Sequence, residues 1–228
     1  MKKVVVLSGA GISAESGIAT FRGADGLWEG HDVTAVASPE GWERDPELVL
    51  DFYNKRRNAI RKAKPNRGHL VLAELQDDYD VEIITQNIDD LHERAGSRNV
   101  LHLHGQINQS RSTKNPGLVY EIDGDELNIG DCCELGSQLR PNVVWFGEMV
   151  PAMEKAMELA SKADYFIVVG TSLLVYPAAG LLDFVSYDVP RFIVDPSMPN
   201  VRTAPLLHLI EEPAGTGLEK VRKMMREL

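Results

Sequence analysis

The chain has 228 residues, of which 43% are hydrophobic and 25% are charged. This composition excludes a collagen, a coiled coil and bulk disorder. The length predicts one large domain, or one domain that carries an insertion. Acidic residues outnumber basic ones by 34 to 24, for a formal net charge of −10. Such a surface repels nucleic-acid phosphate, and no basic patch overrides it, so we expect no nucleic-acid partner.

The cysteines and the N-terminal segment predict the compartment. Cys132 and Cys133 are the two cysteines of the chain and are adjacent, so they cannot build an ordinary disulfide framework. That usage is typical of a reducing compartment. The apolar run Val4–Leu7 is too short for a signal peptide or a membrane span. We therefore expect a cytoplasmic protein with no membrane partner, and the sequence leaves the oligomeric state open.

Short apolar runs rich in β-branched residues alternate with helical stretches. Nearly continuous apolar runs predict strands of a parallel sheet that is covered on both faces. The predicted strands are Val4–Leu7, Val81–Ile84, Tyr165–Val169 and Arg191–Val194, and the predicted helices are Pro151–Ala163, Tyr176–Val185 and Thr216–Leu228. This alternation predicts an α/β fold with an open, doubly wound, Rossmann-like sheet.

Two stretches interrupt the alternation and predict a smaller inserted lobe. Residues 30–76 hold helices and no convincing strand, and residues 108–140 are polar and loop-rich. In the second stretch, Asp123-Gly124 separates two alternating segments, 118–122 and 126–129, which predicts a β-hairpin. We expect one domain over residues 1–228, with a large lobe of 1–29, 77–107 and 141–228 and a small lobe of 30–76 and 108–140.

A glycine-rich loop follows the first predicted strand. Its residues are Gly9, Ala10, Gly11, Ile12 and Ser13. A tight strand-to-helix turn explains these glycines, but a loop in this place of an α/β chain favours nucleotide binding, because glycine lets the backbone approach a pyrophosphate. Instead of a second strand ending in an acid, a second glycine-rich segment, residues 17–28, follows and could close over a bound cofactor.

Five motifs in order carry a resemblance to a known family. They are GAGISAESGIATFRGADGLW at 9–28, TQNID at 85–89, HLHG at 102–105, VVWFGE at 143–148 and GTS at 170–172. The chain resembles the sirtuins, NAD-dependent protein-lysine deacylases, over nearly its whole length. The resemblance implies NAD as cofactor and acylated lysine side chains of proteins as substrates. Nicotinamide, free lysine and O-acyl-ADP-ribose are the implied products.

The resemblance also implies cofactor contacts. The residues concerned are Gly9, Ala10, Gly11, Ile12, Ser13, Ala19, Phe21, Arg22, Trp28, Gln86, Asn87, Ile88, Asp89, Gly170, Thr171, Ser172, Asp195 and Ala214. Asn87 is expected to orient the nicotinamide ribose and its water, and Ile88 and Asp89 to recognise the carboxamide. A capping turn is the alternative interpretation of residues 86–89. Asp195 stands where the family usually has asparagine.

Two histidines alternate with Leu101 and Leu103, so both lie on one face of a strand end. They can be half-exposed residues without a role, or a metal-binding pair that lacks a third ligand. Beside a nucleotide loop, an imidazole suits a general base, because its ordinary pKa of about 6.5 lies near neutrality. By resemblance, the base is His104, which deprotonates a ribose hydroxyl, and His102 supports it.

An arginine interrupts the apolar face of the predicted helix 46–63. Arg56 lies on the face of Val49 and Ile60, and Tyr53 precedes it by one turn. Arg56 can extend to solvent, pair with an internal acid, or bind an anionic ligand together with Tyr53. The pair resembles class III sirtuins, which implies a preference for succinyl-, malonyl- or glutaryl-lysine. Phe146 and Gly147 resemble the strand on which the substrate peptide docks.

The family's structural zinc site is not expected here. Most sirtuins hold zinc with two Cys-x-x-Cys pairs, whereas residues 108–140 contain Cys132, Cys133 and no histidine. Adjacent cysteines make a poor tetrahedral set, so we expect no zinc and inert thiols. The alternatives to an acidic-acyl deacylase are a plain deacetylase, a mono-ADP-ribosyltransferase and an inactive NAD-binding module.

Overall fold

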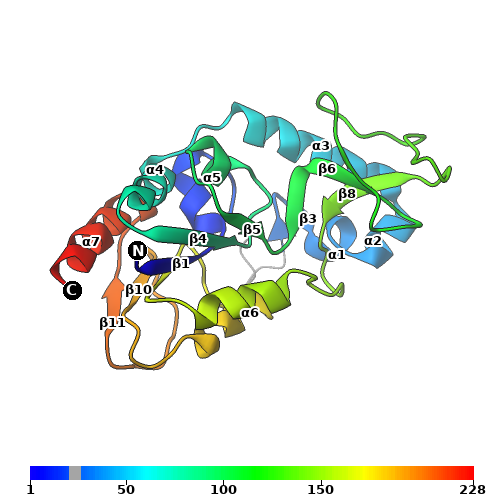
Figure 1. The fold of residues 1–228 in the computed structure, drawn as a ribbon. Coiled ribbons are helices and arrows are strands. Elements are labelled where there is room, and N and C mark those ends of the chain that lie inside the picture. The colour runs from blue at the N-terminus through cyan, green and yellow to red at the C-terminus, as the bar shows by residue number, and fades with distance from the viewer. Residues whose placement is uncertain (21–26) are drawn as a thin grey trace. The chain divides into compact units, whose positions relative to one another are not determined.

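A computed structural model describes residues 1–20 and 27–228 of the chain (Figure 1). These residues form two compact units, each assembled from segments that are distant in sequence. Unit 1 comprises residues 1–20, 64–103 and 150–228, and unit 2 comprises residues 21–63 and 104–149, described from residue 27 onward.

Unit 1 is built on a six-stranded sheet in which every neighbouring pair of strands is parallel. In spatial order the strands are β11 (Leu207–Ile210), β10 (Arg191–Val194), β9 (Tyr165–Val169), β1 (Lys3–Ser8), β4 (Asp80–Thr85) and β5 (Val100–His102). The chain winds outward from β1 to β4 and β5 on one side, and from β9 to β10 and β11 on the other. The predicted doubly wound sheet is confirmed.

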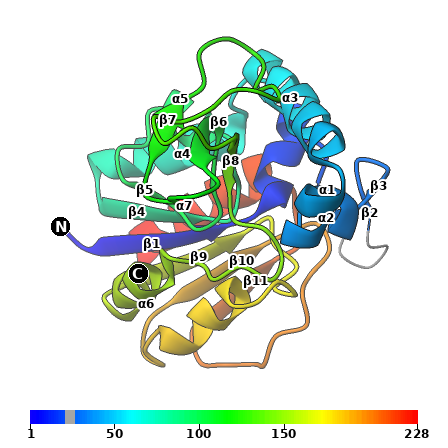
Figure 2. The same ribbon diagram turned by 90° about the vertical axis from the view of Figure 1, so that its right-hand side faces the viewer.

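Helices cover both faces of this sheet, as Figures 1 and 2 show. On one face, α4 (Arg67–Glu74), α7 (Ala214–Glu227) and the 3₁₀ helix η1 (Ala10–Ser16) pack with Val4 and Val6; on the other, α6 (Met153–Ser161) and the 3₁₀ helix η3 (Ala178–Phe184) pack with Val5 and Leu7. The side chains alternate because successive strand residues point to opposite faces. All four are fully buried. Short helices η2 (Leu75–Asp77) and α5 (Leu91–Arg94) complete unit 1.

Unit 2 combines helices with two small antiparallel sheets. Its elements are β2 (Leu27–Trp28), β3 (His31–Asp32), α1 (Val33–Val36), α2 (Pro39–Arg44), α3 (Pro46–Lys62), β6 (Gly105–Ser112), β7 (Val119–Glu121) and β8 (Leu139–Val143). Strand β2 pairs with β3, and β6 lies between β7 and β8. The short strand β3 is a difference from the expectation, which placed no strand in residues 30–76.

Helix α3 is the longest helix among the described residues, with 17 residues. It begins where Asp45 Oδ1 accepts a hydrogen bond from the Leu48 N–H at 3.0 Å, and Pro46 occupies the first helical turn. Both features favour a helix start. In the described parts of the chain, neither this helix nor any other has the length and apolar character needed to cross a bilayer.

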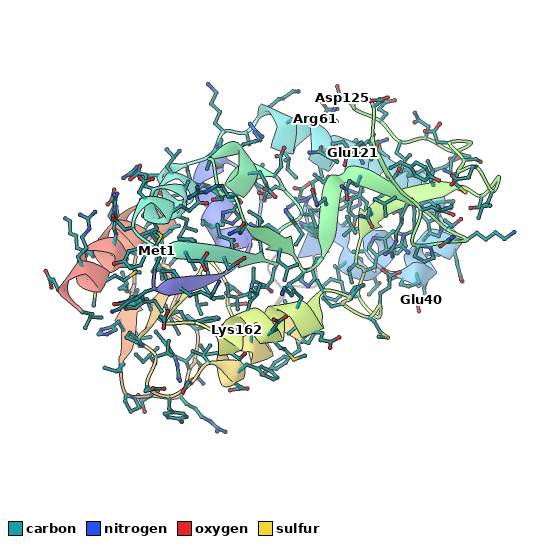
Figure 3. The ribbon with its side chains drawn as sticks, viewed as in Figure 1. Met1, Glu40, Arg61, Glu121, Asp125 and Lys162 are labelled. Atoms are coloured by element: carbon teal, nitrogen blue, oxygen red, sulfur yellow. The ribbon has the colours of Figure 1, made fainter. Side chains whose placement is uncertain are left out.

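The predicted hairpin of residues 118–129 is wrong. Strand β7 pairs with β6, and residues 126–129 form no strand. Polar side chains of α3 hold this segment instead: Asn54 Nδ2 donates to the Leu127 carbonyl at 3.0 Å, and Arg61 pairs with Asp125, as Figure 3 shows. Leu127 is buried in a cluster with Leu50. Backbone groups satisfied by a neighbouring helix do not need a strand partner.

The unit boundaries differ from the predicted lobes at four places, and the first of them puts residues 27–29, expected in the large lobe, in unit 2. Residues 64–76 belong to unit 1, where Val71, Leu72 and Leu75 are fully buried in the same cluster as Val4 of β1. Residues 104–107 and 141–149 belong to unit 2. Residues 64–76 belong to unit 1 because the apolar face of α4 packs against α7 and the sheet.

Candidate functional site

Three glycines meet where β1 and β9 end. The N–H of Gly9 donates to Val169 O at 3.0 Å, and the N–H of Gly11 donates to Gly170 O at 2.8 Å. A Cβ on Gly9 would lie 2.7 Å from Gly170 O, and a Cβ on Gly11 would lie 2.6 Å from Gly170 Cα. Gly170 has a φ of +64°. The backbones therefore cross in contact at the point where the winding reverses, which is the ligand-binding edge of doubly wound sheets.

This close crossing predicts the effect of a single methyl group. Gly11→Ala should lower the free energy of unfolding by about 1–3 kcal/mol, because the new Cβ meets backbone atoms that cannot rotate away. Urea denaturation measures the change. Gly180→Ala is the matched control, since its Cβ would have its nearest neighbour at 3.8 Å. A Gly11→Ala variant as stable as wild type would contradict the close crossing.

The segment after β4 contributes a compact polar group to the same edge. Ser13 Oγ donates to Asp89 Oδ2 at 3.0 Å, and Asn87 Nδ2 donates to Ser13 Oγ at 3.2 Å. All three side chains are buried, as is Ile88. Asp89 Oδ1 also accepts from the Leu91 N–H at 3.2 Å, so the carboxylate additionally caps the following turn. The structure thus brings together residues from two motifs that are 74 positions apart.

A buried polar chain that the sequence analysis missed supports Asn87. Ser8 Oγ donates to Thr85 Oγ1 at 2.9 Å, and the Asn87 N–H donates to the same Thr85 Oγ1 at 3.1 Å. His92 Nε2 lies 2.9 Å from Ser8 Oγ, which has already donated its proton, so Nε2 carries the hydrogen. Burial lowers the pKa of His92 well below its ordinary value. The sequence signal for this polar chain was that a hydroxyl residue, Ser8 or Thr85, ends each of two apolar strands.

A second buried histidine, His69, packs against His92 with ring centroids 5.0 Å apart. Its Nδ1 accepts from the Asn66 N–H at 3.3 Å in the capping box that starts α4. Burial lowers the pKa of His69 to about 4. The ring is therefore neutral in the folded protein at neutral pH, whereas in the unfolded chain it takes up a proton below about pH 6.5.

Acid should consequently destabilise the fold through His69. The free energy of unfolding falls as the pH drops from about 6.5 towards about 4, because the unfolded chain binds the proton more readily. His69→Gln keeps an acceptor for the capping box and removes the titrating ring. Between pH 6.5 and pH 5, wild type should lose about 1–2 kcal/mol more than the variant in urea denaturation. Equal losses would show that His69 does not titrate in this way.

His102 and His104 differ in their surroundings. His102 Nδ1 lies 3.0 Å from the Asn87 carbonyl and Nε2 lies 2.7 Å from Glu93 Oε1. Burial opposes the charged ring, but the hydrogen bond and charge of Glu93 outweigh it and raise the pKa of His102. Both ring nitrogens are engaged, which removes His102 as a candidate metal ligand and leaves it in contact with the Asn87 loop.

His104 follows β5 by two residues and belongs to unit 2. Its carbonyl accepts from the Val144 N–H at 2.9 Å, which anchors its backbone next to β8. The following Gly105 has a φ of +79°, and a Cβ there would lie 2.0 Å from Asn142 O. A glycine is required at this turn, which explains why the histidine is followed by glycine.

The other predicted cofactor residues of unit 1 lie near the ends of its strands. Gln86 Nε2 donates to Thr171 Oγ1 at 3.2 Å, and Ser172 is exposed beside it. Asp195 follows β10, where its Oδ1 accepts from the Ser197 N–H at 2.8 Å and burial raises its pKa. Ala214 begins α7 and is buried.

The remaining glycine-loop residues are placed separately. Ala10 is half-buried and Ile12 fully buried in η1, whereas Ala19 is exposed. Phe21 and Arg22, which were predicted to contact the cofactor, lie outside the described residues.

Tyr53 is held by an aromatic and ionic group within unit 2. Its side chain is 0% exposed, and its hydroxyl accepts from Trp145 Nε1 at 3.1 Å. Arg140 lies over the Trp145 ring at 3.3 Å and forms an ion pair with Glu148 at 2.8 Å. Burial raises the pKa of Tyr53, so the phenol stays protonated and can donate a hydrogen bond. Its orientation is set by partners that are distant in the sequence.

Arg56 points inward and pairs with an acid, Glu29, that lies at the surface. The residue is 5% exposed, its Nη1 forms an ion pair with Glu29, and its guanidinium lies 4.5 Å from the Trp28 ring centroid. Trp28, predicted as a cofactor residue, also packs edge-on against Tyr53. Of the alternatives for Arg56, the structure thus shows pairing with an acid. Sequence analysis missed Glu29, although it directly follows Trp28.

Phe146 and Gly147 lie in a turn, so their placement on a strand is wrong. Strand β8 ends at Val143, and the Glu148 N–H donates to Trp145 O at 3.0 Å. Gly147 has a φ of +88°. The Phe146 N–H donates to Ala37 O at 3.0 Å, and the Phe146 side chain is exposed. The ion pair of Glu148 with Arg140 favours the turn over a continued strand.

The two cysteines of unit 2 lie in the segment between β7 and β8. Cys132 is exposed, whereas Cys133 is buried with its sulfur 3.3 Å from Ser112 Oγ and 3.1 Å from Ser137 Oγ. These hydrogen bonds lower the pKa of the Cys133 thiol to about 7. Among residues 1–20 and 27–228, no cluster of three or more His, Cys, Asp or Glu side chains is arranged to hold a metal ion. The absence of zinc stays a prediction.

The predicted site residues therefore divide between the units. Unit 1 holds Gly9, Ala10, Gly11, Ile12, Ser13, Ala19, Gln86, Asn87, Ile88, Asp89, Gly170, Thr171, Ser172, Asp195 and Ala214. Unit 2 holds Trp28, Tyr53, Arg56, His104, Phe146 and Gly147. Unit 1 thus carries most of the residues expected to contact the cofactor, and unit 2 carries Trp28, the expected base His104 and the residues expected to bind the acylated substrate.

Comparisons with known proteins identify relatives of this chain. The sequence model of the Sir2 family matches residues 9–177. A Helicobacter pylori protein named NAD-dependent protein deacylase is 51% identical over 228 residues, which cover 100% of this chain and 99% of that protein.

Solved structures agree with the sequence comparisons. A Sir2 homologue in complex with NAD has a TM-score of 0.88 and 40% identity, and the match covers 99% of this chain and 90% of that one. A structure described as Sir2 with a p53 peptide and NAD⁺ has a TM-score of 0.80 and 31% identity, covering 99% and 94% of the two chains.

Proposed function

This chain belongs to the Sir2 family and is an NAD-dependent protein deacylase, and from this premise we propose that it removes acidic acyl groups from protein lysine side chains. Succinyl and malonyl groups are the preferred substrates in this proposal, and glutaryl and acetyl groups are further ones. The reaction consumes NAD and one water, and it releases nicotinamide, free lysine and O-acyl-ADP-ribose. The peptide bound in the related Sir2 structure supports a protein substrate.

The observation that carries this proposal is that Arg56 binds a carboxylate, that of Glu29. The guanidinium is buried on the side of α3 that also buries Phe52 and Ile60, and it is paired with Glu29, so its surroundings already accept one carboxylate. A planar guanidinium suits a carboxylate because it can donate two parallel hydrogen bonds. Tyr53, one helical turn earlier, is kept protonated by burial. An acetyl group offers no charge for either residue.

The residues of unit 1 fit NAD. The glycines that cross at β1 and β9 leave no Cβ between the loop backbones, which suits the approach of a pyrophosphate. Ser13, Asn87 and Asp89 offer buried donors and acceptors of the kind that a ribose and a carboxamide require. When bound, NAD supplies a ribose carbon that loses nicotinamide and accepts the acyl oxygen of the substrate.

His104 is the general base in this proposal, taking a proton from a ribose hydroxyl. Asn87 orients the ribose, and its position is maintained by Thr85, which accepts the Asn87 N–H, and by His102, which contacts the Asn87 carbonyl. Asp89, buried and already accepting from Ser13, recognises the carboxamide. No hydride is transferred in this reaction. The base His104 and the amide of Asn87 are therefore the protein groups that this step requires.

A plain deacetylase is the second candidate, because the Glu29–Arg56 ion pair balances the charge of the arginine without any substrate. The test is a kinetic comparison of succinyl-, malonyl-, glutaryl- and acetyl-lysine forms of one peptide with NAD. We expect a higher kcat/KM for at least one acidic acyl group than for acetyl, with nicotinamide release that requires the acylated peptide. A kcat/KM for acetyl that exceeds all three would favour the plain deacetylase. Nicotinamide release without peptide would contradict both.

A further inference from the structure

The carboxylate on Arg56 comes from an unusual place in the backbone. Glu29 and Gly30 are the two residues that connect β2 and β3, with φ values of +50° and +82°. A two-residue turn of this kind requires positive φ at both positions and favours glycine, asparagine or aspartate there. A glutamate at the first position adopts a backbone conformation that is unfavourable for its type. Its side chain nonetheless reaches the buried guanidinium.

The Glu29 carboxylate is in a position to leave Arg56. The Glu29 side chain is 29% exposed, whereas the Arg56 side chain is 6% exposed, so the acid meets the arginine from the solvent side. The strands that hold the turn have two residues each, and a hairpin of this length contributes little stability of its own. Rotation of the side chain to solvent restores the hydration of the carboxylate. Arg56 keeps its stacking on the Trp28 ring.

The geometry points to Glu29 as a specificity-determining residue that competes with the acyl carboxylate of the substrate for Arg56. This inference rests on the proposed function. An acidic acyl group binds only when Glu29 has withdrawn, so its apparent affinity is its intrinsic affinity multiplied by the fraction of molecules in which Arg56 is not paired with Glu29. An acetyl group needs no such withdrawal. Glu29 therefore sets the ratio of acidic-acyl to acetyl turnover.

Glu29→Gln removes the negative charge and keeps the length of the side chain and the backbone conformation. We expect the Kd of NAD-free protein for a succinyl-lysine peptide to fall about 5- to 30-fold, which corresponds to about 1–2 kcal/mol. The Kd for the acetyl-lysine form of that peptide should stay within about twofold. Calorimetry measures both constants, and kcat/KM with NAD should shift in the same direction.

Glu40→Gln is the matched control, because Glu40 is an exposed acid of unit 2, labelled in Figure 3, and the substitution changes the net charge equally. It should leave both constants unchanged. Glu29→Gln tightening both peptides, or neither, would overturn the competition. Weaker succinyl binding would also overturn it, because Glu29 would then be positioning Arg56 for the substrate.

A second variant separates this inference from the proposed function. If Arg56→Met weakens succinyl binding but Glu29→Gln does not strengthen it, the proposed function stands and the competition is overturned. If Arg56→Met leaves succinyl binding unchanged, Arg56 does not bind the acyl carboxylate, and both fail. If wild type prefers acetyl and Glu29→Gln reverses that preference, the competition is supported while the native acyl preference is not.

Discussion

Replacing His104 with glutamine should lower kcat for peptide deacylation by about 10²- to 10⁴-fold. General bases contribute a factor of this size, because the ribose hydroxyl must otherwise lose its proton to water. The backbone at this position depends on the His104 carbonyl and on Gly105, neither of which the substitution alters. We therefore expect the folded structure and the Kd for NAD to stay close to wild type.

The measurement is the formation of O-acyl-ADP-ribose under saturating NAD and peptide, with thermal unfolding as the check on folding. His208→Gln is the matched control, since His208 lies in β11 and stacks on Phe192 at 5.0 Å, a contact of the sheet. Its kcat should be unaffected. If His104→Gln retained more than about a tenth of wild-type kcat, a different group would have to be the base.

Arg56→Met should reduce kcat/KM for a succinyl-lysine peptide by about 30- to 5000-fold. Removing one partner of a desolvated charge pair costs about 2–5 kcal/mol, and each 1.4 kcal/mol is about tenfold. The same variant should change kcat/KM for the acetyl form much less, because methionine retains the apolar volume of the arginine stem. The charge of Glu29 is then solvated, since its side chain is 29% exposed.

Arg56→Lys tests the geometry separately from the charge. Lysine keeps the positive charge but cannot offer two parallel donors to one carboxylate, so we expect an intermediate loss of succinyl turnover. The ratio of succinyl to acetyl kcat/KM is the quantity to compare across wild type and both variants. Losses of equal size on the two substrates would mean that Arg56 supports the fold rather than the acyl group.

Strands β1, β4, β9 and β10 of unit 1 were predictable because their signal is local, whereas β11 was not predicted. The runs at Val4–Leu7 and Tyr165–Val169 are apolar at every position, which only a sheet covered on both faces accommodates. The close backbone approach at the first loop was predictable for the same reason, since Gly-x-Gly directly after a strand is a local pattern that indicates such an approach. The structure places those glycines against Gly170, as a cofactor edge requires.

The residues after Asp123-Gly124 show where local reasoning fails. The alternating pattern of 126–129 is compatible with a strand, and nothing within the segment reveals that Asn54 and Arg61 of α3 bind its backbone and Asp125. The predicted strand at Phe146 and Gly147 was wrong for a similar reason, because Glu148 pairs with Arg140 and the chain turns there. A segment with an alternating pattern forms a strand only when its backbone N–H and C=O groups are not already hydrogen-bonded to side chains of a neighbouring element.

The sequence by itself determined the family, the doubly wound sheet and the identity of the polar residues at the strand ends, because these follow from motifs and from the period of apolar side chains. Tertiary structure alone decided which of those polar residues have partners. Arg56 meets Glu29 across 27 positions, and Ser8 meets His92 across 84. Such pairs form because burial makes an unpaired polar group costly, and the partner is chosen by proximity in the folded chain.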